Sequence, residues 1–268
     1  MRRSLVALTL AGTAACSYIF ELPATSEIPA PETDGGDAAA LPDAPVGDAP
    51  PPYDAPPEIP FCASRTAPSL WCNDFDGVPP PELASLGTVQ VTDAQLLLSN
   101  AVARSSPRSL LVNVRGGTSS TASIEHALGS DPDGLTLSFA QLVSAWETTG
   151  AQLAEIELAG ANGTCFIRLE GGATAWSFTQ VCEAGGVETA RSTTDALVPI
   201  AHGRWQRIAL EVAYGPTPTV TLDIDGARTT AAGVAPLERG LASVTIGAKL
   251  VPIGSVTLFQ DDVLVTSP

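Results

Sequence analysis

Apolar and polar residues alternate in short runs along most of the chain after Pro60. Alternation over about four to eight residues is typical of a β-strand with one buried face, and no stretch keeps a helical period with caps. Gly, Pro, Asp and Asn separate the runs at the spacing of a β-sandwich. The expected strands are Thr88–Leu98, Ser109–Arg115, Leu135–Val143, Ala151–Ala159, Cys165–Glu170, Ala175–Cys182, Gln206–Tyr214, Thr219–Asp225, Ala242–Ala248 and Ser255–Val265. The pattern predicts one all-β domain.

Parity along a strand shows which side chains share a face, because successive side chains point to opposite sides of a sheet. In the segment 165–182 both cysteines share a face with apolar residues, and Arg168, Ser177 and Thr179 lie on the opposite face. The apolar face consists of Cys165, Ile167, Leu169, Trp176, Phe178 and Cys182. We therefore expect a hairpin that turns near Gly171 and Gly172, with both cysteines directed toward the core.

The same rule applies to the segment from Trp205 to Gly226. It places Ile208, Leu210, Val212, Val220, Leu222 and Ile224 inward. Asp223 and Asp225 then face solvent, and Asp225-Gly226 has the composition of a tight hairpin turn. The spacing of these aspartates does not continue into a calcium-binding loop, because Ala227 and the neutral run after it supply no further ligand.

The start of the chain has the features of an export signal. Arg2 and Arg3 precede an apolar segment that is too short to span a membrane. Thr13-Ala-Ala-Cys16 resembles the bacterial lipoprotein signal, which implies a signal peptide over 1–15, a lipidated Cys16 and anchoring in the bacterial cell envelope. Ser17, in place of aspartate, favours the outer membrane. The alternative is an ordinary secretory signal cut near Ala15.

Residues 16–60 form a different compositional region. Between Glu21 and Pro60 there are eleven prolines and nine acidic residues but no basic residue. This composition predicts a disordered linker between the anchor and a domain over 61–268. Removal of the signal peptide with Arg2 and Arg3 would leave 11 of the 13 basic residues and all 29 acidic ones, which gives a net charge of −18. This charge disfavours binding to nucleic acid and to anionic lipid head groups. Membrane contact is therefore expected through the lipid alone.

The cysteines indicate an oxidising compartment. Of five cysteines, four remain beside Cys16, and an even number in an exported protein favours two disulfides. Three pairings are possible, and proximity in sequence favours Cys62 with Cys72 and Cys165 with Cys182. A zinc site would have only His126 and His202 to assist widely spaced cysteines, which disfavours it.

Several short motifs resemble the concanavalin A-like and laminin-G-like domains of extracellular and bacterial surface proteins. They are Trp205 with its alternating strand, Val220–Gly226, Ile246-Gly247, Phe259–Val263 and Cys72–Gly77. The resemblance implies a two-sheet antiparallel jelly-roll sandwich over 61–268, in which the strand near Cys72 pairs with the last strand. Domains of this family bind glycans or proteins and less often cleave glycans.

A catalytic set is not assigned. Glu155-Ile-Glu157 imitates the carboxylate strand of glycan hydrolases, but Ala159 and Gly160 stand where a third acid would be, so a solvated strand face is the preferred interpretation. His126 and His202 lie outside any lyase motif. We expect a lipid-anchored lipoprotein whose non-catalytic domain binds a glycan or a protein in adhesion. The alternatives are a divergent glycoside hydrolase or polysaccharide lyase, and a structural envelope protein without a small ligand.

Ligand and metal positions are weakly marked in the sequence. Trp146 and Trp176 are the candidate platforms for a sugar ring. Four carboxylates near the first and last strands are the candidate ligands of a structural calcium ion, namely Asp74, Asp76, Asp261 and Asp262. Hydrogen bonds from loop backbone are the preferred alternative for these carboxylates, and no other cofactor is expected.

Overall fold

The structure is a computed structural model that describes residues 60–129, 133–215, 217–237 and 240–267. The predicted signal peptide, Cys16 and nearly all of the linker lie outside these residues. The elements are β1 (Trp71–Asn73), α1 (Leu83–Leu86), β2 (Thr88–Thr92), β3 (Ala94–Ser99), β4 (Ser109–Ala127), β5 (Gly134–Thr148), β6 (Gly150–Gly160), β7 (Gly163–Gly172), β8 (Ala175–Ala184), β9 (Val187–Pro199), β10 (Trp205–Ala213), β11 (Thr219–Ile224), β12 (Ala227–Ala232) and β13 (Leu241–Thr266). Within the described ranges, no helix has the length and apolar character needed to cross a membrane.

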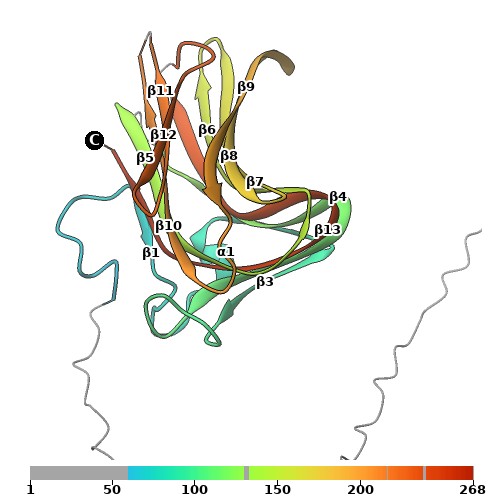
Figure 1. The fold of residues 1–268 in the computed structure, drawn as a ribbon. Coiled ribbons are helices and arrows are strands. Elements are labelled where there is room, and N and C mark those ends of the chain that lie inside the picture. The colour runs from blue at the N-terminus through green and yellow to red at the C-terminus, as the bar shows by residue number, and fades with distance from the viewer. Residues whose placement is uncertain (1–59, 130–132, 216, 238–239, 268) are drawn as a thin grey trace, which may run out of the picture. The chain divides into compact units, whose positions relative to one another are not determined.

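The strands form two antiparallel sheets packed as a jelly-roll sandwich, as the sequence predicts (Figure 1). Sheet I has the order β12-β11-β10-β5-β13-β4-β3, with β1 on the last residues of β13. Sheet II has the order β9-β8-β7-β6-β13-β4-β2. In Figure 1, β10, β11 and β12 stand on one side, β6, β8 and β9 on the other, and β4 and β13 curve beneath them.

Two long strands belong to both sheets. The first part of β13 pairs with β6, and its later part pairs with β5, while β4 follows β13 through the bend. The register of β13 with β4 shifts between Lys249 and Ser255, where the strand turns from one sheet into the other. Gly254 has φ of 125°, and a Cβ there would overlap the carbonyl oxygen of Glu147. Close backbone contact therefore requires glycine at this corner.

The sequence underestimated the lengths of these strands. It predicts separate strands at Ala242–Ala248 and Ser255–Val265, which are one strand in the structure, and it misses the second half of β4 as well as β9 and β12. Conversely, the predicted strand Thr88–Leu98 is interrupted at Asp93, where φ is 48°. β9 has few apolar residues and a mostly exposed face, so periodicity alone does not reveal it.

One hydrophobic core joins the inner faces of both sheets. The buried members include Leu137, Leu210 and Leu222 from sheet I and Ile124, Ile156 and Leu169 from sheet II, each at most 1% exposed. The inward residues predicted for β10 and β11 are all buried, which confirms the parity argument. Burial of side chains of this size contributes about 1.5 to 3 kcal/mol each.

Both predicted disulfides are present. Cys62 pairs with Cys72, and Cys165 pairs with Cys182 directly across β7 and β8. The first bridge attaches the N-terminal residues of the domain to β1, and the second joins two strands of sheet II. Disulfides of this kind are typical of exported proteins.

The Asp225-Gly226 turn is also confirmed. Both residues have positive φ, 52° and 88°, and they connect β11 to β12. Asp223 Oδ1 accepts a hydrogen bond from Gly226 N at 2.8 Å, and Asp225 Oδ1 accepts one from Arg207 N at 2.8 Å. These aspartates therefore stabilise the hairpin, as their place in a turn indicates.

Candidate functional site

A row of polar side chains crosses the outer face of sheet II. The backbone registers of β9, β8, β7, β6, β13, β4 and β2 place one residue of each strand in line. This polar row consists of Thr193, Thr179, Arg168, Glu155, Thr245, Glu125 and Thr88. Adjacent strands are about 4.8 Å apart, so the row extends over about 29 Å.

The centre of the polar row is an ion pair. Arg168 Nε donates to Glu155 Oε2 at 2.7 Å, and Glu155 is only 6% exposed. Thr179 Oγ1 donates to Glu170 Oε2 at 2.8 Å and lies 3.0 Å from Thr193 Oγ1. The interpretation of Glu155 as a solvated residue was therefore wrong, because its long neighbours cover it and Arg168 neutralises it.

Glu157 lies on the same face of β6 as Glu155, as predicted, but its surroundings differ. Burial is the main cause that raises the pKa of Glu157, and the nearby carboxylates of Glu155 and Glu125 raise it further, while Lys249 lowers it. Within the described ranges, no hydrogen bond or ion pair joins its carboxylate to another side chain. Glu157 is therefore free to bind a ligand or carry a proton, and so is Glu125, which likewise has no such partner among the described residues.

The surroundings of Glu157 also include an aromatic ring. Phe166 is the cross-strand neighbour of Glu157 and is partly exposed. The guanidinium of Arg168 lies over the Phe166 ring, 5.0 Å from its centroid. The face thus combines hydroxyls, carboxylates, a cation and one ring, which are the groups that hold a sugar through hydrogen bonds and apolar contact. The face is less suited to cleavage of a glycosidic bond by two carboxylates, because Glu155 is already paired with Arg168.

The predicted tryptophan platforms lie elsewhere. Trp176 is 1% exposed and its Nε1 donates to Gln206 Oε1, so this residue belongs to the core and offers no surface to a sugar. Trp146 is partly buried, packs edge-on against Trp176 at 6.3 Å and donates from Nε1 to Gly172 O. Parity placed Trp176 with the apolar face, and that observation could have excluded it as a platform.

The four predicted calcium ligands come together beside the loop that precedes β4. Ser105 Oγ donates to Asp262 Oδ1 at 2.7 Å and lies 3.4 Å from Asp76 Oδ2. Asp74 accepts a hydrogen bond from Cys62 N at 3.0 Å and raises the pKa of both Asp76 and Asp262. Burial is the largest cause of the raised pKa in both of these residues.

Asp261 is buried at a bulge in β13. The bulge falls between Asp261 and Leu264, with Asp262 at φ of 52°. The Asp261 carboxylate accepts hydrogen bonds from three main-chain N–H groups, those of Arg104, Ser105 and Asp262, at 2.8 to 3.0 Å. Burial nevertheless raises the pKa of Asp261 to about 7.

Hydrogen bonds hold all four carboxylates, because an N–H or O–H donor reaches at least one oxygen of each. Among the described residues, no group of three or more His, Cys, Asp or Glu side chains is arranged to hold a metal ion. The preferred alternative from the sequence, hydrogen bonding to loop backbone, agrees with these contacts.

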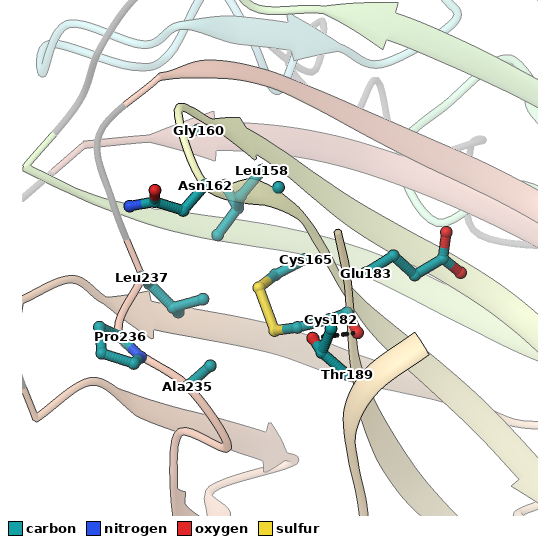
Figure 2. Close-up of a pocket in the computed structure, with 11 residues that line it drawn as sticks. Leu158, Gly160, Asn162, Cys165, Cys182, Glu183, Thr189, Ala235, Pro236 and Leu237 are labelled. Carbon is teal, nitrogen blue, oxygen red and sulfur yellow. Dashed lines mark hydrogen bonds between the residues drawn. A yellow bond between two sulfur atoms is a disulfide. The ribbon is translucent and has the colours of Figure 1, made fainter. Parts of the chain in front are cut away.

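A small hollow lies beside the Cys165–Cys182 disulfide (Figure 2). Its volume is about 180 Å³, and Leu158, Ala235, Pro236 and Leu237 line it together with the bridge. In Figure 2 the side chain of Glu183 extends away from the disulfide, and Thr189 Oγ1 donates to Cys182 O. The hollow presents few polar groups to a ligand, so we assign no role to it.

The two histidines are held in separate environments. The His126 ring stacks on Trp71 with centroids 4.5 Å apart, and its Nδ1 lies 2.8 Å from Leu86 O. His202 is exposed in a loop that is bridged to Val143. Neither histidine lies in the polar row, so the row lacks the residue type that most often transfers protons.

No protein-family model matches the chain, and no curated protein matches it. The fold is similar to the solved endo-beta-1,4-glucuronan lyase from the fungus Trichoderma reesei, with 14% identity, a TM-score of 0.57, and coverage of 68% of this chain and 90% of that one. It is also similar to the cellulose induced protein Cip1, with 14% identity, a TM-score of 0.51, and coverage of 66% and 88%. At these identities the likeness concerns the fold, which is the jelly-roll sandwich.

Proposed function

We propose that this domain binds a glycan chain across the outer face of sheet II without cleaving it. The observation that carries the proposal is the polar row, which aligns one hydrogen-bonding residue from each of seven strands. A length of about 29 Å suits a polymer better than a single small molecule. The likeness to two proteins named for glucuronan and cellulose adds support from the fold.

Four members of the row, Thr193, Thr179, Arg168 and Glu155, are held in place before any ligand binds. Glu155 and Arg168 fix each other, and Thr179 is fixed by Glu170 and Thr193. Side chains that are already ordered lose little conformational entropy on binding, which favours affinity. Phe166, beside Glu157, would supply apolar contact to the face of one sugar ring.

The charge of the face selects the class of glycan. Glu125, Glu155, Glu157 and Glu170 bring four carboxylates, whereas Arg168 and Lys249 bring two cations. A polyanionic chain would meet this excess of negative charge, so we expect neutral polysaccharides to bind better. The same excess disfavours nucleic acid.

A glycan array probed with the full chain tests the proposal. We expect signal on neutral polysaccharides, and loss of at least tenfold in affinity for Arg168→Met, which removes the centre of the row. Arg228→Met is the matched control, because Arg228 is also a paired arginine but lies on β12 of sheet I. An array with no glycan signal, together with capture of a surface protein from intact cells, would instead favour protein adhesion.

Glu157 supports an enzymatic alternative. Its raised pKa and its lack of a partner among the described side chains are properties of a general acid. Release of reducing sugar from a bound polysaccharide, abolished in Glu157→Gln, would establish a glycan-cleaving enzyme. Binding without any product over long incubation would support the non-catalytic function.

The position of the domain in the cell is part of the proposal. Two disulfides agree with an exported protein. We propose that Cys16 is lipidated and that residues 16–60 hold the glycan-binding domain away from the envelope membrane. Fractionation of cells tests this point, because Cys16→Ser should move the protein from the membrane fraction to the soluble fraction.

A further inference from the structure

A second hollow lies on the opposite side of the sandwich from the polar row. It is a cavity of about 310 Å³ at the outer face of sheet I, where β5 and β10 meet the loop before β4. Its wall residues are Phe61, Arg104, Trp205, Arg207, Asp225 and Asp262. The small side chains of Ser138 and Ala140 form its floor and leave the space open. The volume is at the lower end of the range for small-molecule sites, which begins at about 300 Å³.

Four of the nine arginines that the structure describes form an ion pair, and the two of this hollow belong to the other five. Arg168, Arg191, Arg204 and Arg228 each form an ion pair with a carboxylate. The guanidinium groups of Arg104 and Arg207 form none with any residue that the structure describes, although acidic residues outnumber basic ones 29 to 13 in the chain. Two unpaired guanidinium groups at one cavity, in a protein of such negative charge, point to an anionic ligand.

The carboxylates at the rim are already engaged. Asp225 lies 3.5 Å from the Arg204 guanidinium and accepts a hydrogen bond from Arg207 N. Asp262 accepts a hydrogen bond from Ser105 Oγ at 2.7 Å. The Arg204 guanidinium offsets the charge of Asp225, while burial raises the pKa of Asp262 and Arg104 lowers it. Arg104 and Arg207 form no ion pair among the described residues, so both are available to an incoming anion.

Two aromatic side chains give the hollow an apolar wall. Trp205 is partly exposed at the start of β10. The Arg65 guanidinium lies 4.1 Å from the centroid of the Phe61 ring, which fixes this ring near the N-terminal disulfide. Aromatic walls beside a cationic group suit a ring compound that carries one acidic group.

We infer that this hollow binds a ring compound bearing a carboxylate, of the size of one acidic sugar, through Arg104 and Arg207. The ring would rest between Trp205 and Phe61 above the floor of small side chains. The carboxylate could come from an acidic sugar or from a non-sugar cyclic acid. The site lies on sheet I, so it is independent of the glycan chain proposed for sheet II.

Isothermal titration calorimetry on the full chain tests this inference with three probes: galacturonate, galactose and cyclohexanecarboxylate. We expect at least one acid to bind and neutral galactose not to bind. If only galacturonate binds, the ligand is an acidic sugar, and if only cyclohexanecarboxylate binds, it is a non-sugar acid. If both bind, the site recognises the ring and the carboxylate and does not require the sugar hydroxyls. Absence of binding by both acids, or equal binding of galactose, would overturn the inference.

Variants locate the binding. Arg104→Gln and Arg207→Gln should each weaken the acid at least tenfold, while thermal unfolding confirms that these exposed substitutions leave the fold intact. Arg115→Gln is the matched control, since Arg115 is an exposed arginine outside this hollow, and it should bind as the parent does. Glu157→Gln on sheet II should also leave acid binding unchanged, and an unaltered affinity in Arg207→Gln would refute the assignment.

Discussion

Two pairs of carboxylates in this domain each lie close together in sequence within a strand, but their surroundings in the folded domain differ. Glu155 and Glu157 lie on β6, where Arg168 pairs with the buried Glu155 and Glu157 is partly exposed. Asp261 and Asp262 lie at a bulge, where Asp261 is held by three main-chain N–H groups and is fully buried. A carboxylate that accepts hydrogen bonds from the backbone contributes to the stability of the fold. A carboxylate that contacts only side chains can still exchange these contacts for a ligand.

This difference assigns a role to each pair. Asp261 connects the loop before β4 to the last strand, so its removal should affect stability. Glu157 has no such connection within the described residues, so its removal should affect binding and leave stability nearly unchanged. The following changes test this division.

The largest effect is expected for Asp261→Ala. This change leaves three main-chain N–H groups without their acceptor, and each unsatisfied buried donor costs about 1 to 3 kcal/mol. We expect the free energy of unfolding to fall by about 4 kcal/mol in urea denaturation. Asp262→Ala, which removes one hydrogen bond from Ser105, should cost about 1 kcal/mol, and an equal loss in both variants would contradict the comparison.

The pH dependence of stability should come from the same pair. The folded-state pKa of Asp261 is about 7, above its ordinary value of 3.8, so the folded protein binds more protons than the unfolded chain between these values. Stability is then greatest below about pH 4 for this group and declines as pH rises through 7, by roughly 4 kcal/mol in all and roughly 3 kcal/mol between pH 5 and pH 8. Urea unfolding at pH 5 and pH 8 measures the decline, which Asp261→Asn should flatten; a parent curve that rises over this interval would refute it.

Arg168→Met should have an intermediate effect. It leaves the Glu155 carboxylate without its partner at a position that is 6% exposed. Because Arg168 itself is partly exposed, we expect a loss of about 2 kcal/mol, below the range for a fully buried pair. The double variant Glu155→Gln with Arg168→Met should recover much of this loss in a denaturation cycle, and additive losses would show that the two residues are not coupled.

Glu157→Gln should have the smallest effect on folding. The change removes a carboxylate whose charged form is disfavoured by burial and then by the neighbouring carboxylates, so the free energy of unfolding should change by less than about 0.5 kcal/mol. Affinity for a neutral glycan is the quantity expected to change. A loss of stability above about 1 kcal/mol, measured by the same denaturation, would place Glu157 in the structural class with Asp261.

The sequence predicts the fold well because its signals are local. Alternation fixes the buried face of β10 and β11, and the cysteine spacing favours the two bridges that form. The turn at Asp225-Gly226 is visible because both residue types tolerate positive φ. Each of these features depends on neighbours within about twenty residues.

The candidate site is poorly predicted because it depends on register between distant strands. Glu125 and Glu155 are each paired with Thr245, which comes from the far end of the chain. Parity shows that Glu155 faces outward, but it does not show that Arg168 and its neighbours bury it. The cavity on sheet I has the same origin, because Arg104 and Arg207 meet only after β5, β10 and the preceding loop assemble.

The course of β13 through both sheets has a consequence for the order of folding. This strand pairs with β1, β4, β5 and β6, and Trp71 at the start of the domain is paired with Val265 near its end. Contacts that are this distant in sequence slow folding, because a long loop must close before they form. During synthesis and export, therefore, neither sheet can be completed until β13 emerges, and the two halves of the sandwich should acquire their final structure in one cooperative step.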